Sequence, residues 1–286
     1  MIPFGTAGLR GKMIPGPDGI NRDTVAWATH GLATWLQDGE KIFSATERRN
    51  TTVQDAPRGV VIAYDTRHHS RSFAELAANI LASRNIPVYY FDSYQPTPIL
   101  VFCIRRLNAA AGIVITASHN PKEYNGYKVY DAAGIQIGNQ AATVIRSGME
   151  AAAAAGTVTG SIQSLAELNN CYLIDNQHLA AYHDYVKGLW QLPGDTREIN
   201  IVYTPMQGTG GKHLATILQA AGFERVQLVA SQFAPDPEFS AVSSPNPESA
   251  GALDRACALA VETQADLVLA TDPDADRAAA VIMDAL

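Results

Sequence analysis

Residues 112–121 read Gly-Ile-Val-Ile-Thr-Ala-Ser-His-Asn-Pro and join an apolar run to a short polar loop. The run from Gly112 to Ile115 predicts a buried strand, because consecutive branched apolar residues suit the interior of a sheet. Ser118 follows directly after this strand and is therefore held out from the sheet, where a ligand can reach it. The stretch predicts an α/β sheet with a polar site at the end of one strand.

Turn-forming residues follow the serine. Pro121 and the pair Asn125-Gly126 predict tight turns. Such turns would bring Ser118, His119 and Lys128 onto one loop surface. A hydroxyl, an imidazole and an amine together are the parts of a group-transfer site, whereas an ordinary polar surface turn is the alternative interpretation.

A second motif lies far downstream, where Asp272, Asp274 and Asp276 follow the apolar run 265–271. That run predicts another buried strand, and in an extended chain alternate side chains point the same way. Three clustered carboxylates repel one another unless a cation is present. Hard oxygen ligands suit Mg²⁺, with Mn²⁺ and Ca²⁺ as alternatives, and a solvated acidic turn is the competing interpretation.

Three segments together point to a known family. They are Phe-Gly-Thr-Ala-Gly-Leu-Arg-Gly at 4–11, residues 116–121 with Asn-Gly-Tyr-Lys at 125–128, and Asp-Pro-Asp-Ala-Asp-Arg at 272–277. In this order they resemble the motifs of the α-D-phosphohexomutase superfamily, the phosphoglucomutase and phosphomannomutase group. The first segment and the stretch 125–130 are most similar to its phosphoglucomutase/phosphopentomutase-like branch. The resemblance extends over the whole chain.

The resemblance implies a role for each matching residue of the nucleophile and metal loops. Ser118 would carry a phosphoryl group. Asp272, Asp274 and Asp276 would bind Mg²⁺, with a phosphate oxygen on Ser118 as a further ligand. These roles are chemically consistent, because a phosphoserine beside three carboxylates needs a cation and phosphoryl transfer depends mainly on positioning and charge stabilisation.

Basic and polar side chains around that centre would serve the substrate. By the same resemblance, Lys128 and Arg10 would lie near the sugar hydroxyl that accepts or gives the phosphoryl group. Lys128 is the better general acid or base, because arginine stays protonated at any relevant pH. It would act as a base only where burial or positive charge lowers its pKa. The nucleophile, the phosphoserine and the substrate would be supported by His119, Asn120 and Arg277.

The resemblance implies an α/β fold with two mixed, mainly parallel α/β/α sandwich domains. Residues 1–175 would form phosphohexomutase domain I with the phosphoserine loop, and residues 176–286 would form domain II with the metal-binding loop. Motifs of domains III and IV, which carry sugar-recognition and phosphate-binding loops in the family, are absent from this sequence. Because remote binding energy helps to drive the chemical step, the chain alone is expected to turn over poorly.

Alternating apolar runs and helical spacings support the same architecture. Strands are expected at 59–64, 88–91, 112–115, 199–203, 226–229, 267–270 and 278–283. Helices are expected at 72–83, from Pro98 to about 107, in the Ala-rich 149–156, at 178–190, within 209–221 and at 249–263.

Charge and cysteine content argue against a nucleic-acid-binding protein and against a disulfide-stabilised one. The net charge of −7, without a basic stripe, argues against a nucleic-acid partner. Three widely separated cysteines fit a reducing compartment better than a disulfide framework. The sequence has no secretory leader and no membrane-spanning apolar run, so a cytoplasmic location without a membrane partner is expected. The oligomeric state is left open.

The expected activity is that of a phosphosugar mutase, which interconverts a sugar 1-phosphate and 6-phosphate through a phosphoserine and a bisphosphorylated intermediate. The resemblance favours phosphoglucomutase, activated by glucose 1,6-bisphosphate, with phosphomannomutase or phosphopentomutase as alternatives. A phosphatase that uses Asp272 or Asp274 as its nucleophile is a different enzyme class. A catalytically incompetent fragment that binds metal or phosphosugar is the third hypothesis.

Three further polar stretches allow two interpretations each. Residues 208–212, Gly-Thr-Gly-Gly-Lys, resemble a phosphate loop without its full spacing, and a loop that enters a helix is the favoured interpretation. Gln207 stands where the family commonly has a histidine, which removes one supporting contact. Asp65, Arg67 and His68 at a strand end fit a structural loop and a site-supporting loop equally well.

Overall fold

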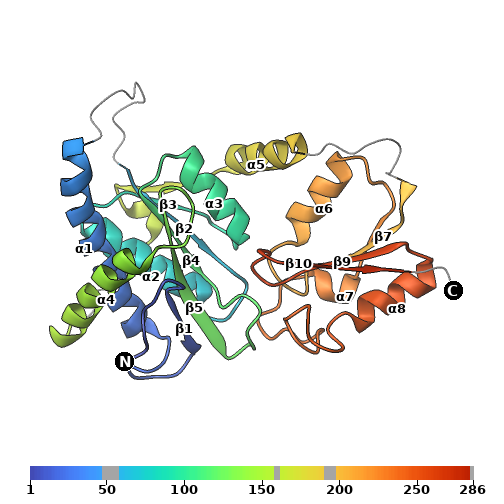
Figure 1. Cartoon of the computed structure of the whole chain (residues 1–286), viewed down its shortest axis with the longest axis horizontal. Helices are drawn as coiled ribbons and strands as arrows, with labels where there is room; N and C mark the ends of the chain where they lie inside the picture. The colour runs from blue at the N-terminus through green and yellow to red at the C-terminus, as the bar shows by residue number, and fades with distance from the viewer. Residues whose placement is uncertain (47–57, 158–161, 190–197, 284–286) are drawn as a thin grey trace.

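The structure, a computed structural model, describes residues 1–46, 58–157, 162–189 and 198–283. Two β-sheets with helices packed against them lie side by side, and loops from the two meet between them (Figure 1). Each sheet contains parallel and antiparallel pairs, with the parallel pairs in the majority, as the sequence predicts. Across the described ranges, none of the helices combines the length and the apolarity needed to cross a membrane.

The first sheet has the strand order β1-β5-β4-β2-β3-β6. Its strands are β1 (Leu9–Lys12), β2 (Val60–Tyr64), β3 (Val88–Tyr90), β4 (Ala111–Ile115), β5 (Tyr124–Asp131) and β6 (Cys171–Leu173). Strand β5 pairs antiparallel with both β1 and β4, whereas β4, β2, β3 and β6 are mutually parallel. Strands β2 and β4 are continuous apolar runs, because helices cover both of their faces.

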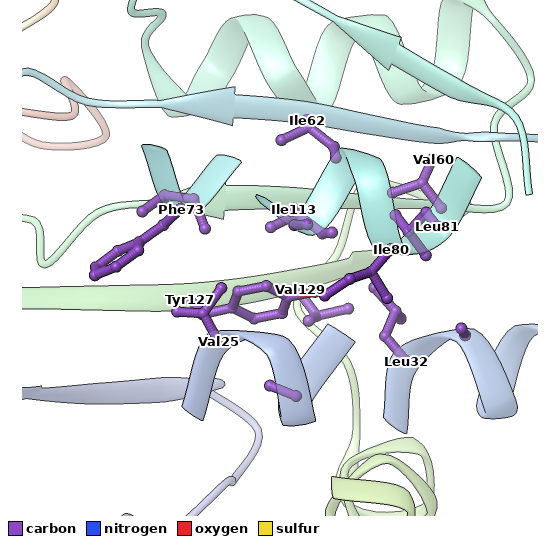
Figure 2. Close-up of a cluster of buried hydrophobic side chains, with 14 of the residues drawn as sticks. Val25, Leu32, Val60, Ile62, Phe73, Ile80, Leu81, Ile113, Tyr127 and Val129 are labelled. Carbon is purple, nitrogen blue, oxygen red and sulfur yellow. The ribbon is translucent and has the colours of Figure 1, made fainter. Parts of the chain in front are cut away.

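Helices enclose this sheet on both sides. One face is covered by α1 (Arg22–Thr46), α2 (Ser70–Ser83) and α4 (Asn139–Ala154), and the other by α3 (Thr97–Arg106) and α5 (Asn176–Gly188). A short 3-10 helix, η1 (Leu165–Glu167), precedes β6. Figure 2 shows the core of the first face, where Leu32 of α1 and Leu81 of α2 pack with Ile113 and Val129 from the sheet.

The second sheet is smaller and has the order β10-β9-β7-β8. Its elements are β7 (Ile201–Thr204), α6 (Gly211–Ala220), β8 (Val226–Leu228), α7 (Ala230–Phe233), α8 (Asp254–Thr263), β9 (Leu267–Thr271) and β10 (Ala278–Ile282). Leu218 of α6 packs on one face with Ile201, and Ala260 of α8 packs on the other with Val202. The outermost strand, β10, alternates between exposed and partly buried residues, and its Ile282 is 78% exposed.

Helix α5 connects the two regions. Toward the first sheet, the ring of Tyr182 contacts Phe102 of α3 at a centroid distance of 5.5 Å. Toward the second, Nε2 of His183 lies 3.1 Å from Nδ1 of His213 on α6. Strand β6 ends at Leu173 just before this helix, so the proposed domain boundary at 175/176 falls in the link between them. As a domain boundary it stays a proposal.

The predicted strands and most predicted helices are confirmed to within a few residues. The helix expected from residue 249 begins at Asp254, because residues 249–252 form a turn in which Ala252 N–H donates to Ser249 O. The end of the connecting helix at residue 190 lies outside the described residues. Helix α1, strands β1, β5 and β6, and the short helices η1 and α7 are additional to the prediction. Helix α4 begins at Asn139, well before the Ala-rich segment from which it was inferred.

The prediction of a turn at Asn125-Gly126 is wrong. Both residues lie within β5, where Gly126 pairs with Arg10 and Asn125 with Gly11. The glycine serves a close backbone approach, because a Cβ at this position would lie 2.3 Å from the carbonyl oxygen of Thr116. Lys128 is therefore a strand residue and not part of a loop shared with Ser118.

Candidate active site

Ser118 lies in the loop that follows β4, at the carboxyl end of a parallel strand as predicted. Its φ of 53° is in the left-handed region, which costs a non-glycine residue about 1–3 kcal/mol. The Thr116 hydroxyl accepts a hydrogen bond from the Ser118 N–H at 2.8 Å and holds this conformation. The Ser118 side chain is buried, and its Oγ donates to Asp272 Oδ2 at 2.8 Å. The serine of one sheet thus contacts a carboxylate of the other.

The three predicted carboxylates converge in the loop after β9. One oxygen from each of Asp272, Asp274 and Asp276 lies within 4.8 Å of the others. The loop is not the extended segment that the spacing suggested: Ala275 has a φ of 51° and its N–H donates to Asp272 O, which closes a turn. The turn brings the carboxylates together as effectively as alternation along a strand would.

The polar chemistry of this loop fits a divalent cation. Oδ1 of Asp274 is fully buried, and no described residue forms a hydrogen bond with it. Burial and the charges of Asp274 and Asp276 raise the pKa of Asp272 to about 7. A divalent ion would both coordinate the free oxygen and relieve this repulsion, and oxygen donors of this kind suit Mg²⁺.

Lys128 reaches the carboxylates from β5 of the first sheet. Its Nζ donates to Asp274 Oδ2 at 2.8 Å and to Asp276 Oδ2 at 3.4 Å, and its side chain is 3% exposed. Burial favours the neutral amine, but the two carboxylates outweigh burial and raise the pKa of Lys128. Burial likewise opposes ionisation of Asp274, yet the Lys128 ammonium holds the pKa of that carboxyl below its usual value. Without a bound cation, Lys128 is therefore a proton donor and not a base.

His119 lies beside Ser118, with Nδ1 3.2 Å from Ser118 Oγ. Burial, assisted by the positive charges of Arg277 and Arg10, lowers the pKa of His119. The imidazole is therefore neutral near pH 7 and has one nitrogen free to accept a proton.

Arg10, Asn120 and Arg277 lie at the exposed side of the site. Nη1 of Arg10, which lies on β1, donates to Asn120 Oδ1 at 3.3 Å. The N–H of Arg277 donates to Asp272 Oδ1 at 3.1 Å, and its guanidinium Nε is 3.9 Å from Asp276 Oδ1. The Arg277 side chain is 45% exposed. The structure therefore places every sequence-predicted site residue around one centre, with the two arginines toward solvent.

Thr97, at the start of α3, is a site residue that the sequence analysis missed. Its N–H donates to Asp274 O at 2.9 Å and its hydroxyl donates to Asp274 Oδ2 at 3.1 Å. The only local signal was its position before Pro98, which marked a helix start but not a contact with a loop 177 residues away. Together with Lys128, it fixes Asp274 from the first sheet.

The loop at 208–212 supports the carboxylate loop. The N–H and the hydroxyl of Thr209 both donate to Pro273 O, at 2.8 and 2.9 Å. A Cβ on Gly208 would lie 2.4 Å from Pro273 Cα, so this close packing requires glycine. Gln207 turns away from this contact, since its side-chain amide donates to Asp236 Oδ2 and accepts from the N–H of Ala241.

Comparison with known proteins assigns the chain to a family. Residues 1–155 match the model for phosphoglucomutase/phosphomannomutase alpha/beta/alpha domain I, and residues 180–284 match the model for domain II. The chain belongs to the phosphoglucomutase/phosphomannomutase family. The two matched ranges contain every residue of the site described above, and the predicted superfamily is confirmed.

Family members of similar sequence are phosphoglucomutases of staphylococci. The chain is 38% identical over 281 residues to the phosphoglucomutase of Staphylococcus aureus and 39% identical over 286 residues to that of Staphylococcus epidermidis. The alignments cover 96% and 99% of this chain but 47% and 49% of those relatives. The chain thus spans about half the length of the curated relatives it matches.

Solved structures of the family share the fold. A candidate phosphomannomutase of Thermus thermophilus superposes with a TM-score of 0.73 at 25% identity, covering 98% of this chain and 57% of that one. A phosphoglucomutase/phosphomannomutase family protein of Burkholderia thailandensis also gives 0.73, at 21% identity, covering 98% of this chain and 54% of that one. The second likeness bears on the fold alone.

Proposed function

We propose that this chain carries the reacting half of a phosphosugar mutase that interconverts a sugar 1-phosphate and 6-phosphate. The observation that carries the proposal is the 2.8 Å hydrogen bond from Ser118 Oγ to Asp272 Oδ2, which joins a nucleophile of one sheet to a carboxylate cluster of the other. Ser118 would carry the phosphoryl group as a phosphoserine. This arrangement matches the needs of phosphoryl transfer, which are positioning and charge stabilisation.

Asp272, Asp274 and Asp276 would hold the cation, which we assign as Mg²⁺ because the donors are all hard oxygens. A phosphate oxygen on Ser118 would complete the ligand set. When bound, the ion neutralises charge on the transferring group. Lys128 and Thr97 both donate to Asp274 Oδ2, which leaves its buried Oδ1 for the ion, so the first sheet would also orient a ligand from the second.

Proton transfer is assigned to two side chains. When Ser118 is loaded from a sugar bisphosphate, its Oγ bonds to phosphorus and the bond from phosphorus to the sugar oxygen breaks. Lys128, whose ammonium donates to Asp274 and Asp276, would give its proton to the departing sugar oxygen. The neutral ring of His119 accepts the serine proton across 3.2 Å. In the reverse transfer both protons return.

The substrate we favour is glucose phosphate, with glucose 1,6-bisphosphate as the activator, because the similar curated relatives are named phosphoglucomutase. Arg10 and Asn120 lie together at the exposed side of the site and would meet the sugar phosphate, and Arg277 would support the phosphoserine. The net charge of the chain is −7, which would repel an anionic substrate. The positive charges of Arg10 and Arg277 offset this repulsion at the site.

The test is intact-mass analysis and phosphosite mapping after incubation with glucose 1,6-bisphosphate and Mg²⁺. We expect one phosphoryl group on Ser118, absent from Ser118→Ala and Asp274→Ala and retained in Ser72→Ala, a control serine on an exposed helix start. Chelation of the cation should stop the transfer. Mannose and ribose bisphosphates in place of the glucose compound test the sugar.

Other outcomes of this experiment are equally informative. Phosphate on Asp272 or Asp274 would replace the proposal with the aspartate-nucleophile phosphatase. A folded chain that accepts no phosphoryl group from any of the three donors would show that it does not perform this half-reaction.

A further inference from the structure

Arg67 contacts the loop of the nucleophile along its whole length. It follows β2 in the sequence and its side chain is buried. Its two terminal nitrogens donate to four backbone carbonyls, Nη2 to those of Ser118 (2.6 Å) and Asn120 (2.5 Å) and Nη1 to those of Pro121 (2.8 Å) and Tyr124 (3.2 Å). One guanidinium therefore gathers the carbonyl groups from the nucleophile to the first residue of β5.

The orientation of this guanidinium is itself fixed. Nε of Arg67 lies 3.2 Å from Asp65 Oδ2, and both side chains are fully buried. Oδ1 of Asp65 accepts from the Ser70 hydroxyl at 2.6 Å and from the Arg67 N–H at 2.9 Å. A buried arginine with a buried counter-charge and a rigid planar fork is suited to hold carbonyls in one geometry.

The same guanidinium also contacts the second sheet's region. The Phe239 ring lies against it, with Cζ of Arg67 5.0 Å from the ring centroid. Glu238 extends this contact, because its Oε1 lies 2.6 Å from Nε2 of His68 and its Oε2 accepts from Nζ of Lys122 at 2.6 Å. Two neighbouring residues, Glu238 and Phe239, thus contact Arg67, the adjacent His68 and Lys122 of the first region.

We propose that Arg67 is a positioning residue: by holding the Ser118 carbonyl it keeps the serine in its left-handed conformation, and through Phe239 it couples that loop to the region of the second sheet. The inference rests on the proposed function, for which Ser118 is the nucleophile. Arg67 itself touches neither Ser118 Oγ nor the aspartates through any hydrogen bond of the described structure.

Lysine cannot reproduce this arrangement. Its single ammonium offers three donors from one point, whereas the four carbonyls are divided between two nitrogens of the guanidinium. Arg67→Lys keeps the buried charge beside Asp65 but should release at least part of the loop. It therefore separates positioning from simple charge balance.

The experiment compares the full chain with Arg67→Lys, Arg67→Ala and Phe239→Leu, and with Arg71→Ala as an exposed control whose guanidinium pairs with Glu75. Hydrogen exchange by mass spectrometry follows the amides of Ser118, Asn120 and Tyr124, which are hydrogen-bonded in this loop. Mn²⁺ binding reports on the aspartates, and the rate of Ser118 phosphorylation reports on reactivity. Each measurement is repeated with added guanidinium at concentrations far below those that unfold the protein.

We expect both Arg67 variants to exchange faster in residues 116–124 and to phosphorylate Ser118 about 100-fold more slowly, with Mn²⁺ affinity retained in Arg67→Lys, which keeps the positive charge. Free guanidinium should restore protection and rate in Arg67→Ala alone. Phe239→Leu should show a smaller effect in the same residues. Exchange unchanged in 116–124 in Arg67→Lys and Phe239→Leu would overturn the proposal, even if Arg67→Ala fails to fold.

The two proposals fail in different ways. A wild-type chain that is not phosphorylated, with faster loop exchange in the Arg67 variants, would remove the proposed function and retain the positioning contact. A wild-type chain that is phosphorylated at the same rate as Arg67→Lys, with unchanged exchange, would retain the function and remove the role of Arg67.

Discussion

The loop that carries Ser118 and the loop that carries the three aspartates both end buried parallel strands, but they are held in different ways. The Ser118 loop is fixed from within its own region, by Thr116 and by the four carbonyl contacts of Arg67. The aspartate loop is held from its own region by Thr209, whose N–H and hydroxyl donate to Pro273 O, and also from the opposite region by Thr97 and Lys128. Ser118 is thus positioned within its own region, whereas the position of Asp274 also depends on contacts between the two regions.

The sheets that support these loops also differ in how far their strands are buried. All five residues of β4 are buried, whereas β10 leaves every second residue exposed. The buried first sheet holds Ser118 in a fixed position. The aspartate loop of the more exposed second sheet is placed in part by its contacts with the first region. Loss of the contacts made by Thr97 and Lys128 should therefore affect the aspartates more than the serine.

The largest effect is expected from Asp274→Ala. This change leaves the ammonium of Lys128, which is 3% exposed, with only the 3.4 Å contact to Asp276. Loss of a partner from a buried ion pair costs about 4 kcal/mol, measured as the free energy of unfolding in urea without added cation. Asp276→Ala is the matched control, because that side chain is 28% exposed. Equal losses in the two variants would show that docking of Asp274 contributes nothing special.

The next effect is expected from Gly208→Ala. The new Cβ would lie within 2.6 Å of two backbone atoms of Pro273, so the aspartate loop must shift. We expect the free energy of unfolding to fall by about 3 kcal/mol and Mn²⁺ affinity to fall with it, since overpacking of this kind moves the backbone. Calorimetric titration measures the affinity. Gly188→Ala, at the end of α5 with open space around it, is the control and should leave both quantities intact or slightly improved.

Acid should weaken the connection through α5. Burial, with smaller effects of His183 and Lys212, lowers the pKa of His213 to about 4, whereas the unfolded residue titrates near 6.5. The unfolded chain binds this proton first, so the stabilisation is present above about pH 6.5 and is lost as the pH falls toward about 4. Over that window we expect the wild type to lose about 2 kcal/mol more than His213→Gln. Identical pH profiles of urea unfolding would contradict this assignment.

The smallest effect is expected when isoleucine is replaced by valine at one position in each sheet. Ile113→Val in the fully buried β4 should lower the free energy of unfolding by about 1 kcal/mol, because a methylene is removed from a packed core. Ile282→Val in β10, where the side chain is 78% exposed, should change it by less than about 0.5 kcal/mol. Similar values for both would mean that the outer face of the second sheet is covered in solution.

The positions of the two loops can be predicted from the sequence because each depends on the residues directly before it. A buried run that ends in polar residues places Ser118 and Asp272 at strand ends, and this needs no knowledge of the rest of the chain. The Asn125-Gly126 pair shows the limit. Its local chemistry is that of a turn, and only the approach of the Thr116 carbonyl reveals why glycine stands in a strand.

Contacts between the sheets could not be predicted by the same means. Thr97 and Asp274 are 177 residues apart, and neither has a motif that pairs it with the other. The pKa of Lys128 likewise depends on which carboxylates reach it after folding, and they reverse the lowering that burial alone would cause. Arg67 could be judged only as a polar residue at a strand end until its four carbonyl partners were seen.

The ion pair of Lys128 also bears on how the chain is made. The carboxylates that it contacts follow it by 146 and 148 residues, so the ribosome releases the lysine long before its partners. N-terminal regions generally fold first during synthesis at about 5–20 residues per second. For several seconds the Lys128 ammonium must therefore stay hydrated in the nascent chain. The surroundings of Lys128 become buried only after Asp274 and Asp276 have left the ribosome. The candidate site would then be completed only when the aspartate loop has been made and neutralises the Lys128 ammonium.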